Sequence, residues 1–350
     1  MHLYWIVFLI VAPLFGLKQR TFFYLGFVAL SLSLFSALQS IDVSTDRATY
    51  IDFYQSAEDG SLSNSLFVIE PFFQLIFRGF SGDPALQILG FFIVCFIGIS
   101  AKFYLISKYS QNIPLSCVLF ISYLFLLQDM NQIRIGAALG FIYCAIISFY
   151  KGKKGIWLAC SMVSMCFHFS AVLSLFAPLY VYRRLDQKKL LFVVTLLVVL
   201  ALLWLPLGAA DRLVALLSGL DPTGKLKWYL ANSTFDTVNP VKRLLPHLLF
   251  LIPIIIKFPM LCRVYPLIKL FVPLYLIYIA SFILLSPIPV LAYRVSDIFL
   301  FSSIFVIPSI VLVVRQKSVA KLLVFAFAVF QFVYLIYQLE IFGSYSIAPI

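Results

Sequence analysis

Long apolar segments alternate with short polar or basic stretches along most of the chain. A helix needs about 20 apolar residues to cross the hydrocarbon core of a bilayer, and it satisfies its backbone hydrogen bonds internally. The pattern therefore predicts an all-α, polytopic transmembrane helix bundle of about 11–12 membrane segments, folded as a single integral membrane domain over residues 1–350. The expected full spans are 3–17, 21–41, 84–107, 113–127, 130–150, 190–207, 244–256, 266–285, 298–314 and 322–340.

The stretch 156–182 does not fit the pattern of full spans. It is too short for two spans and too long for one, and basic clusters border it on both sides. We expect a hairpin of two short helices with its tip near His168. Non-helical backbone at membrane depth is tolerated where protein or water surrounds it.

Basic residues predict which side of the membrane each span end faces. Lys and Arg accumulate in cytoplasmic loops, and most of the 26 basic residues obey this rule if Lys102, Lys108 and Lys151 lie inside. No basic residue precedes the apolar run 3–17, so we expect a retained span with an external N-terminus rather than a signal peptide. Of the 14 acidic residues, only Asp186 then lies inside. The external loops are 42–83 and 208–243.

Composition supports a membrane protein and excludes several other classes. The chain is 63% hydrophobic and 11% charged, and its mean hydropathy is +1.05, whereas soluble domains are about a quarter charged. The net charge of +12 does not indicate nucleic acid, because the basic residues sit between apolar runs. The cysteines lie within apolar segments without zinc-site spacing, and no phosphate-binding glycine loop occurs. We therefore expect no cofactor, no metal and no nucleic-acid partner.

A polar run enters the span 130–150 and ends in an arginine. An unpaired charge at that depth costs roughly 2.5–3.5 kcal/mol on insertion scales and usually marks a functional site. Asn131 precedes Arg134 by three residues, so we expect the two to share a helical face. The alternative is that Arg134 only reaches toward the interface. The run favours substrate binding by Asp129, Asn131, Gln132 and Arg134.

His168 is a candidate catalytic residue because of where it lies. It follows Phe167 at the expected tip of the hairpin, within an otherwise apolar stretch. A single histidine is often a hydrogen-bonded structural residue, and that alternative stays open here. Because His168 lies at a helix break at membrane depth, a functional role is about as well supported as the structural one.

The first external loop mixes carboxylates with aromatic rings. Carboxylates bind sugar hydroxyls and can remove a proton from one of them, and aromatic rings stack on sugar faces. A solvated loop is the alternative, but it explains Glu70 less well, because Pro71 is a start signal for an apolar helix. The candidates in this loop are Asp46, Tyr50, Asp52, Tyr54 and Glu70.

Arg294 and Asp297 lie at the expected outer mouth of the span 298–314. Guanidinium groups match phosphate oxygens, so Arg134 and Arg294 are expected to clamp a pyrophosphate. Lys242 and Arg243 add to this positive field or, as an equal alternative, anchor the chain at the interface.

Several short motifs together resemble the EpsG-like branch of the Wzy polysaccharide polymerases. Their order and spacing carry the resemblance, which covers roughly residues 1–340, and Ile135 departs from it where a polar residue is expected. The motifs are Asp46…Tyr50…Tyr54, Val68-Ile69-Glu70-Pro71-Phe72, Gln132-Ile133-Arg134 with Ala137-Ala138, Phe167-His168-Phe169-Ser170-Ala171, and Arg294.

The resemblance implies a membrane glycosyltransferase that polymerises undecaprenyl-pyrophosphate-linked repeat units at the periplasmic face of the bacterial inner membrane. Its product would be O antigen, capsule or exopolysaccharide. Its partners would be the lipid-linked glycan and membrane lipids, and a chain-length regulator stays open. Arg134 and Arg294 are then expected to bind the donor pyrophosphate, and Tyr50 and Tyr54 to hold sugar. The base would be His168, Glu70 or Asp52.

Two other functions stay open at this point. A flippase or transporter for lipid-linked oligosaccharides would need polar residues that continue into the cytoplasmic half, and few occur there. An O-antigen ligase or acyltransferase would share the donor and the geometry, so the sequence separates it poorly from a polymerase.

Overall fold

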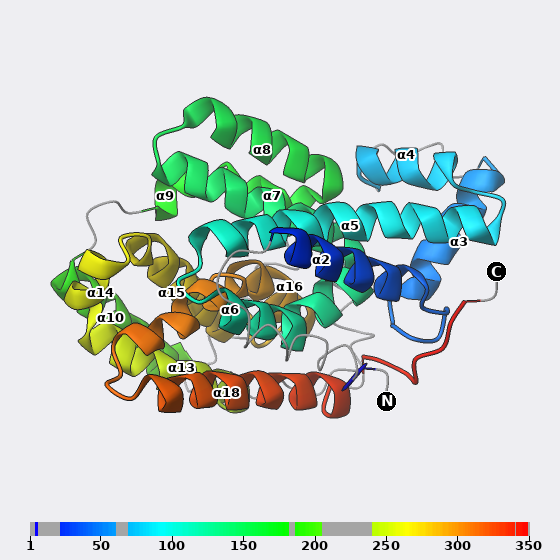
Figure 1. Ribbon diagram of the computed structural model, residues 1–350. Helices are drawn as coiled ribbons and strands as arrows, with labels where there is room; N and C mark the ends of the chain where they lie inside the picture. Colours follow the sequence, from blue (N-terminus) through cyan, green and yellow to red (C-terminus); the bar gives the residue numbers. More distant parts are fainter. Residues whose placement is uncertain are drawn as a thin grey trace. The chain divides into compact units, whose positions relative to one another are not determined.

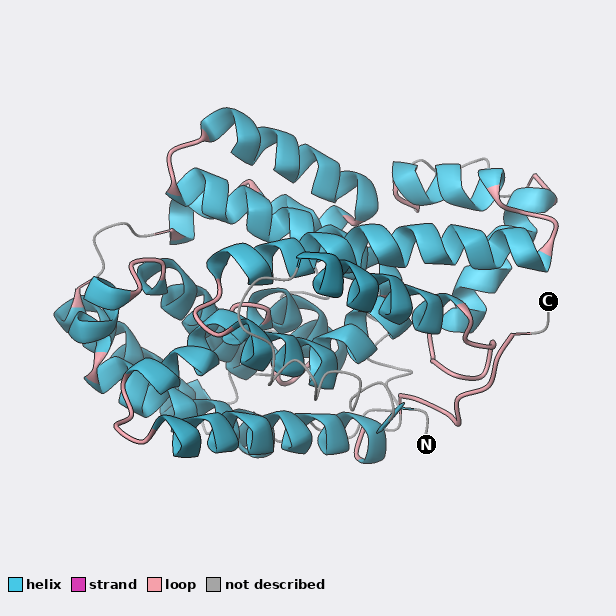
Figure 2. Cartoon of the chain, in the orientation of Figure 1, coloured by secondary structure: helices cyan, strands magenta, loops and turns pink. Residues whose placement is uncertain are grey.

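The computed structural model describes residues 4–5, 22–60, 69–181, 186–204, 240–339 and 341–348. Within these ranges the chain is helical and contains no strand, only two isolated β-bridges (Figures 1 and 2). The all-α class is confirmed. Nearly all of the expected first span and the larger part of the loop 208–243 lie outside the described residues.

The chain divides into two compact units, one formed by residues 1–181 with 321–350 and the other by residues 182–320. The first unit contains α2 (Phe22–Ala37), α3 (Arg47–Glu58), α4 (Pro71–Gly79), α5 (Pro84–Tyr109), α6 (Ile113–Leu119), the π-helix η3 (Phe120–Asn131), α7 (Ile133–Tyr150), α8 (Lys154–Phe167), the 3-10 helix η4 (Phe169–Ser174), α9 (Ala177–Tyr180) and most of α18 (Lys317–Tyr337). The second contains α10 (Gln187–Trp204), α13 (Pro240–Ile256), α14 (Phe258–Val264), α15 (Ile268–Leu285), α16 (Pro289–Leu300), α17 (Ser303–Val306) and η5 (Ile307–Leu312).

Six helical segments in the described ranges are long and apolar enough to cross a membrane, or seven if the bent pair Arg243–Ile256 and Phe258–Val264 forms one span. Tyr24–Ala37 and Lys154–Phe167 are shorter apolar helices. The chain is therefore a multi-pass membrane helix bundle. The six segments are Pro84–Tyr109, Ile113–Asn131, Ile133–Tyr150, Ile268–Leu285, Leu291–Leu312 and Lys317–Tyr337.

Two helices form within the described part of the first external loop, α3 and the expected helix α4. Asp46 precedes α3, and α4 begins at Pro71 after Glu70, whose backbone is extended (φ −62°, ψ 147°). Proline at the first helical position has no N–H left unsatisfied, so this start is favourable. Phe73, Ile76 and Phe77 form the buried face of α4. The helix start predicted after Glu70 is confirmed.

Helices α5 and α7 pack closely, since small residues meet where they cross. A Cβ atom on Gly98 would lie 2.8 Å from Cα of Ala137, and one on Gly140 would lie 2.5 Å from Cβ of Ala101. Glycine at such positions lets two membrane helices approach each other. This packing fixes the start of α7, which carries Arg134.

The segment 156–182 breaks at His168, as expected, but its return limb is not a second full helix. Helix α8 ends at Phe167, His168 is extended (φ −157°, ψ 129°), and the chain returns as η4 and a single turn, α9. The Trp157 indole donates a hydrogen bond to the carbonyl oxygen of Ser174 (2.9 Å), which ties the two limbs together.

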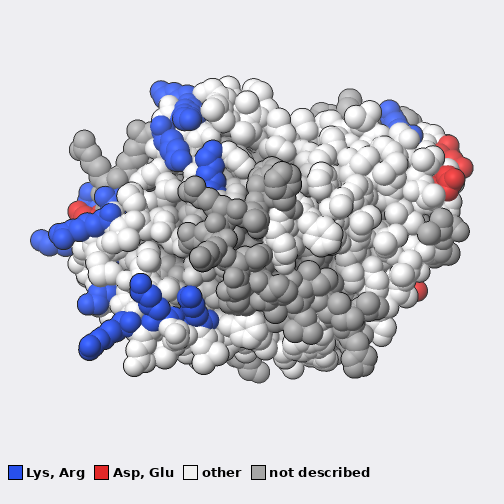
Figure 3. Space-filling model, in the orientation of Figure 1, with Lys and Arg blue, Asp and Glu red and all other residues white. Residues whose placement is uncertain are grey.

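Charge is sorted along the first unit. Figure 3 shows Lys and Arg side chains over the connection between α7 and α8 and Asp and Glu side chains over the α3 end. The C-terminal tail runs beside residues 38–44, where Ser40 N–H donates to the carbonyl oxygen of Ser346 (2.9 Å). The tail therefore lies at the same end of the unit as the first external loop.

Candidate functional site

A buried carboxylate joins two of the predicted site residues. Arg134 Nη1 lies 2.9 Å from Oε2 of Glu70, and His168 Nδ1 lies 3.1 Å from its Oε1. The Glu70 side chain is 2% exposed, whereas Arg134 and His168 are 25% and 29% exposed. The guanidinium of Arg134 and the imidazole of His168 are thus partly accessible, whereas the Glu70 carboxylate that contacts both is buried.

Three helix ends position these side chains. Glu70 lies at the N-terminal end of α4, Arg134 in the first turn of α7, and His168 at the C-terminal end of α8. The rings of Phe72 and Phe167 pack with centroids 4.3 Å apart, and they join α4 to α8 beside Glu70 and His168. The site therefore depends on the packing of helices that are distant in sequence.

Aromatic rings border the arginine. The Cζ atom of Arg134 lies 5.9 Å from the ring centroids of both Tyr50 and Phe53, within the range of cation–π attraction. Burial raises the pKa of the Tyr50 hydroxyl, and the charge of Asp46 adds to the rise. Tyr50 therefore stays protonated near neutral pH. Phe53, which is half-buried, is a site neighbour that the sequence did not single out.

The electrostatics of the site keep Glu70 ionised. Burial alone would raise the pKa of its carboxyl group, but the hydrogen bond with His168 and the charges of Arg134 and His168 outweigh burial. The pKa falls from 4.5 to about 2. A carboxylate held this way is a weak base, so Glu70 is better suited to orient its partners than to accept a proton.

The contact with Glu70 selects one tautomer of His168. An ionised carboxylate only accepts hydrogen bonds, so Nδ1 of His168 must carry the proton that it donates to Oε1. The N–H of Ser170 lies 3.4 Å from the same Nδ1 and is the weaker contact. In neutral His168, Nε2 then holds the free lone pair, which is the arrangement of a general base oriented by a carboxylate.

The remaining candidates of the first loop differ in exposure. Asp52 is exposed, and Asp46 uses its backbone N–H to donate to Oδ1 of Asn131 (2.9 Å). Tyr54 is fully buried between Phe77 and Phe91. Its ring packs against other rings, and its expected role in holding a sugar stays a prediction.

One prediction about the polar run before Arg134 needs correction. Asn131 and Arg134 do not share a helical face, because η3 ends at Asn131 and Gln132 (φ −92°, ψ 57°) interrupts the helix before α7. Asp129 is 1% exposed and lies 2.5 Å from Nζ of Lys102, so its carboxylate faces another charge, and its expected substrate contact stays a prediction. Asn131 is also buried, while Gln132 is partly exposed.

Lys102, which was counted with the basic residues of the cytoplasmic side, is not exposed at the end of a span. Its side chain is fully buried inside the packing of the first unit, paired with Asp129. The sequence already indicated a buried lysine, since Lys102 lies well inside the apolar segment that ends near Lys108.

The second unit contains its own buried charge pair. Arg243 donates a hydrogen bond to Oδ1 of Asp297, and its Cζ atom lies 4.3 Å from the ring centroid of Tyr293. The carboxylate of Asp297 is therefore engaged by Arg243, and its expected contact with substrate stays a prediction. Arg294 is exposed. The clamp formed by Arg134 and Arg294 stays a prediction, because the two residues belong to different units.

No group of three or more potential metal ligands occurs among the described residues. The reactive groups that the first unit brings together are a guanidinium, an imidazole and a buried carboxylate. These groups can bind an anion and move a proton.

The fold and this site define a multi-pass membrane protein with a charged site at helix ends. The chain belongs to the EpsG family, which matches residues 22–349. EpsG is a family of Wzy-type polymerase-like proteins, and it indicates a role in polysaccharide polymerisation. Neither the curated proteins nor the solved structures gave a match to the chain.

Proposed function

We propose that the chain is a membrane glycosyltransferase that polymerises undecaprenyl-pyrophosphate-linked oligosaccharide repeat units at the periplasmic face of the bacterial inner membrane. The observation that carries the proposal is the double contact of Glu70 with Arg134 and His168. A guanidinium suited to bind phosphate and an imidazole suited to act as a base would then work side by side, as glycosyl transfer from a pyrophosphate carrier requires. Membership in the EpsG family supports the same substrate class.

In this mechanism His168 is the base and Glu70 orients it. Nε2 of His168 takes the proton of the acceptor hydroxyl as that oxygen attacks the anomeric carbon of the donor sugar. The bond from this carbon to the pyrophosphate oxygen breaks, and its electron pair leaves with the pyrophosphate. Asp52 is a poorer candidate for the base than His168, because it is exposed and makes no contact with this network that the structure shows.

Arg134 stabilises the leaving group. Its fork of N–H donors matches phosphate oxygens, and Glu70 engages only Nη1. Once His168 has taken the proton, Arg134, Glu70 and His168 together carry a net charge of +1 instead of zero. Positive charge therefore develops beside the pyrophosphate at the moment when its own negative charge grows, which favours the transition state.

The direct test is reconstitution of the purified full-length chain with the single-repeat lipid-linked oligosaccharide that accumulates in a deletion strain. We expect long-chain product from the wild type and at least a hundredfold less from Arg134→Ala, since loss of one well-placed donor costs about 10²–10³ in rate. Arg78→Ala is the matched control, because Arg78 is an exposed arginine of α4. Normal chain length from Arg134→Ala at equal protein amount would refute the assignment.

The polysaccharide pattern of the deletion strain separates this proposal from its rivals. Loss of a polymerase leaves one repeat unit on the final acceptor. Loss of a ligase leaves polymer on the lipid carrier. Loss of a flippase leaves single repeats on the cytoplasmic side, where periplasmic enzymes cannot use them.

A further inference from the structure

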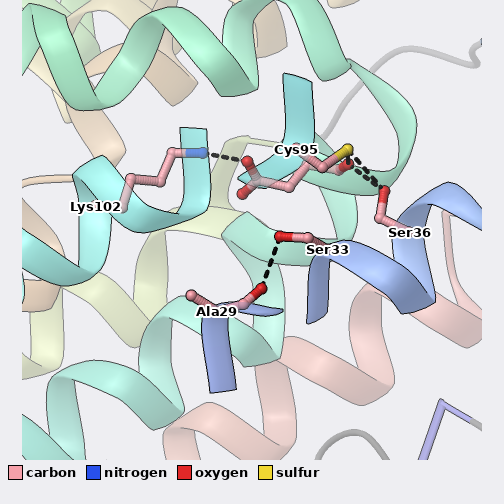
Figure 4. Close-up of polar contacts among 6 residues, drawn as sticks. Ala29, Ser33, Ser36, Cys95 and Lys102 are labelled. Atoms are coloured by element: carbon pink, nitrogen blue, oxygen red, sulfur yellow. Dashed lines mark hydrogen bonds and ion pairs between the residues drawn. The ribbon is translucent and has the colours of Figure 1, made fainter. Parts of the chain in front are cut away.

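An ion pair inside the first unit is almost completely buried. Nζ of Lys102, from α5, lies 2.5 Å from Oδ1 of Asp129, from η3, and the side chains are 0% and 1% exposed (Figure 4). Oδ2 of Asp129 has no hydrogen-bond partner among the described residues. Burying charge in a membrane protein is costly, and such residues usually have a function.

Side chains from outside η3 hold its last turn. Ser36 of α2 donates a hydrogen bond to the carbonyl oxygen of Asp129 (2.6 Å), and Gln39 donates one to the carbonyl oxygen of Met130 (2.7 Å). The final carbonyl groups of a helix lack partners within that helix, so these bonds complete the end of η3. Figure 4 shows Ser36 of α2 and Cys95 of α5 meeting at this point.

The last turn of η3 also bears directly on α7. A Cβ atom on Gly136 would lie 2.4 Å from the carbonyl oxygen of Gln128 and 3.1 Å from Oδ1 of Asp129. The carboxylate of Asp129 therefore lies between Lys102 of α5 and the start of α7. Gly136 follows Arg134 by two residues, so a shift of Asp129 would be transmitted to the turn that carries Arg134.

We propose that Lys102 and Asp129 are positioning residues that set the place of Arg134 against the donor pyrophosphate. The inference rests on the proposed function of Arg134. A π-helix is rare, and π-helical turns are frequently found at functional sites. Here η3 brings Asp129 to Lys102, and the break at Gln132 then starts α7 in the orientation that presents Arg134 to Glu70.

The test compares steady-state kinetics per folded molecule, with the single-repeat undecaprenyl-pyrophosphate oligosaccharide as the probe. Lys102→Met and Asp129→Asn each leave one buried charge without its partner, so their folded yield will fall. The double variant Lys102→Met/Asp129→Leu removes both charges and is expected to recover folded yield. We expect it to keep a KM at least fivefold above wild type, with the pH profile of kcat unchanged.

A milder pair of variants guards against misfolding. Ser36→Ala removes the bond to Asp129, whereas Ser33→Ala removes a buried bond to Ala29 within the same helix. We expect at least a twofold rise in KM for Ser36→Ala and none for Ser33→Ala. Equal effects of the two would overturn the inference. So would a double variant that restores wild-type KM, because the pair would then be only structural, or one that shifts the pH profile.

Arg134→Lys separates the inference from the proposed function. If Arg134→Lys leaves KM unchanged, the proposed role of Arg134 fails whatever Lys102 does. A triple variant combines Arg134→Lys with Lys102→Met/Asp129→Leu. If Arg134→Lys alone raises KM, and the rise in KM of the triple variant equals the product of the two separate rises, the pair does not act through Arg134. The inference alone then fails. We expect the two effects to be smaller together than their product, as for sites that share one path.

Discussion

The ring of Phe72 packs against the ring of Phe167 with centroids 4.3 Å apart, and this contact joins the helix that starts after Glu70 to the helix that ends before His168. The geometry between carboxylate and imidazole therefore depends on apolar packing next to it. The motif that contains Glu70 and the motif that contains His168 are far apart in the sequence, but this contact makes them parts of one site.

Replacing Phe72 with Leu tests that dependence. Leucine keeps apolar volume but loses the ring contact, which is worth about 0.5–1.5 kcal/mol. We expect a small fall in melting temperature and a larger, roughly tenfold fall in polymerisation, because His168 loses its fixed distance to Glu70. The melting temperature in detergent and the product ladder measure the two effects. A loss of activity no larger than the loss of folded protein would contradict the prediction.

Replacing His168 with Gln tests the base. A positioned general base contributes about 10²–10⁴ in rate, so we expect a loss in that range with donor KM changed less than threefold. Asp52→Asn is the comparison, because Asp52 is the exposed rival for the role, and we expect it to retain activity within threefold. The opposite ranking would transfer the role of base to Asp52.

The pH dependence of folding stability tests whether Glu70 is ionised and paired in the folded chain. Its pKa in the folded chain, about 2, lies below the ordinary 4.5, so its stabilising contribution is complete above pH 4.5 and is lost as pH falls toward 2. We expect the stability difference between wild type and Glu70→Gln to be constant from pH 8 to about 5.5 and to shrink below pH 4.5. Melting temperatures across this range measure it. The exposed Glu58→Gln should show no such difference.

Gly136→Ala tests the contact between η3 and α7. The added methyl group would meet the carbonyl oxygen of Gln128 at 2.4 Å, and overpacking of this kind costs about 1–3 kcal/mol. Gly155→Ala in α8 is the matched control, since its added methyl group would meet nothing within 4 Å. We expect a lower melting temperature for the first variant and an unchanged or slightly higher one for the second. Equal melting temperatures would show that η3 and α7 separate easily.

Asp297→Asn should destabilise the second unit without touching the proposed chemistry of the first. It leaves the buried Arg243 without its carboxylate, and removing one partner of a buried pair costs about 3–5 kcal/mol. Arg294→Ala should instead change stability by less than about 1 kcal/mol, because contacts of exposed charges contribute little, and it should raise donor KM if Arg294 binds pyrophosphate. Unfolding by denaturant and donor titration distinguish the two variants.

The sequence by itself determined the membrane class, the all-α fold and the helix starts that local chemistry dictates. Apolar length decides where a helix can span, and Pro71 marks the start of α4, because both depend on neighbours along the chain. The motifs around Glu70, Arg134 and His168 also stood out in the sequence, because charge is rare in apolar surroundings.

Tertiary structure alone decided which charges meet. The structure shows that Asp129 is buried against Lys102 and Tyr54 against Phe77, and that Lys102, counted among the cytoplasmic basic residues, lies inside the packed first unit. The sequence pattern around a charged residue in an apolar segment is the same whether its side chain faces water, substrate or another charge. The distinction depends on partners brought close by the packing of α5, η3 and α7, and a single sequence does not contain those distances.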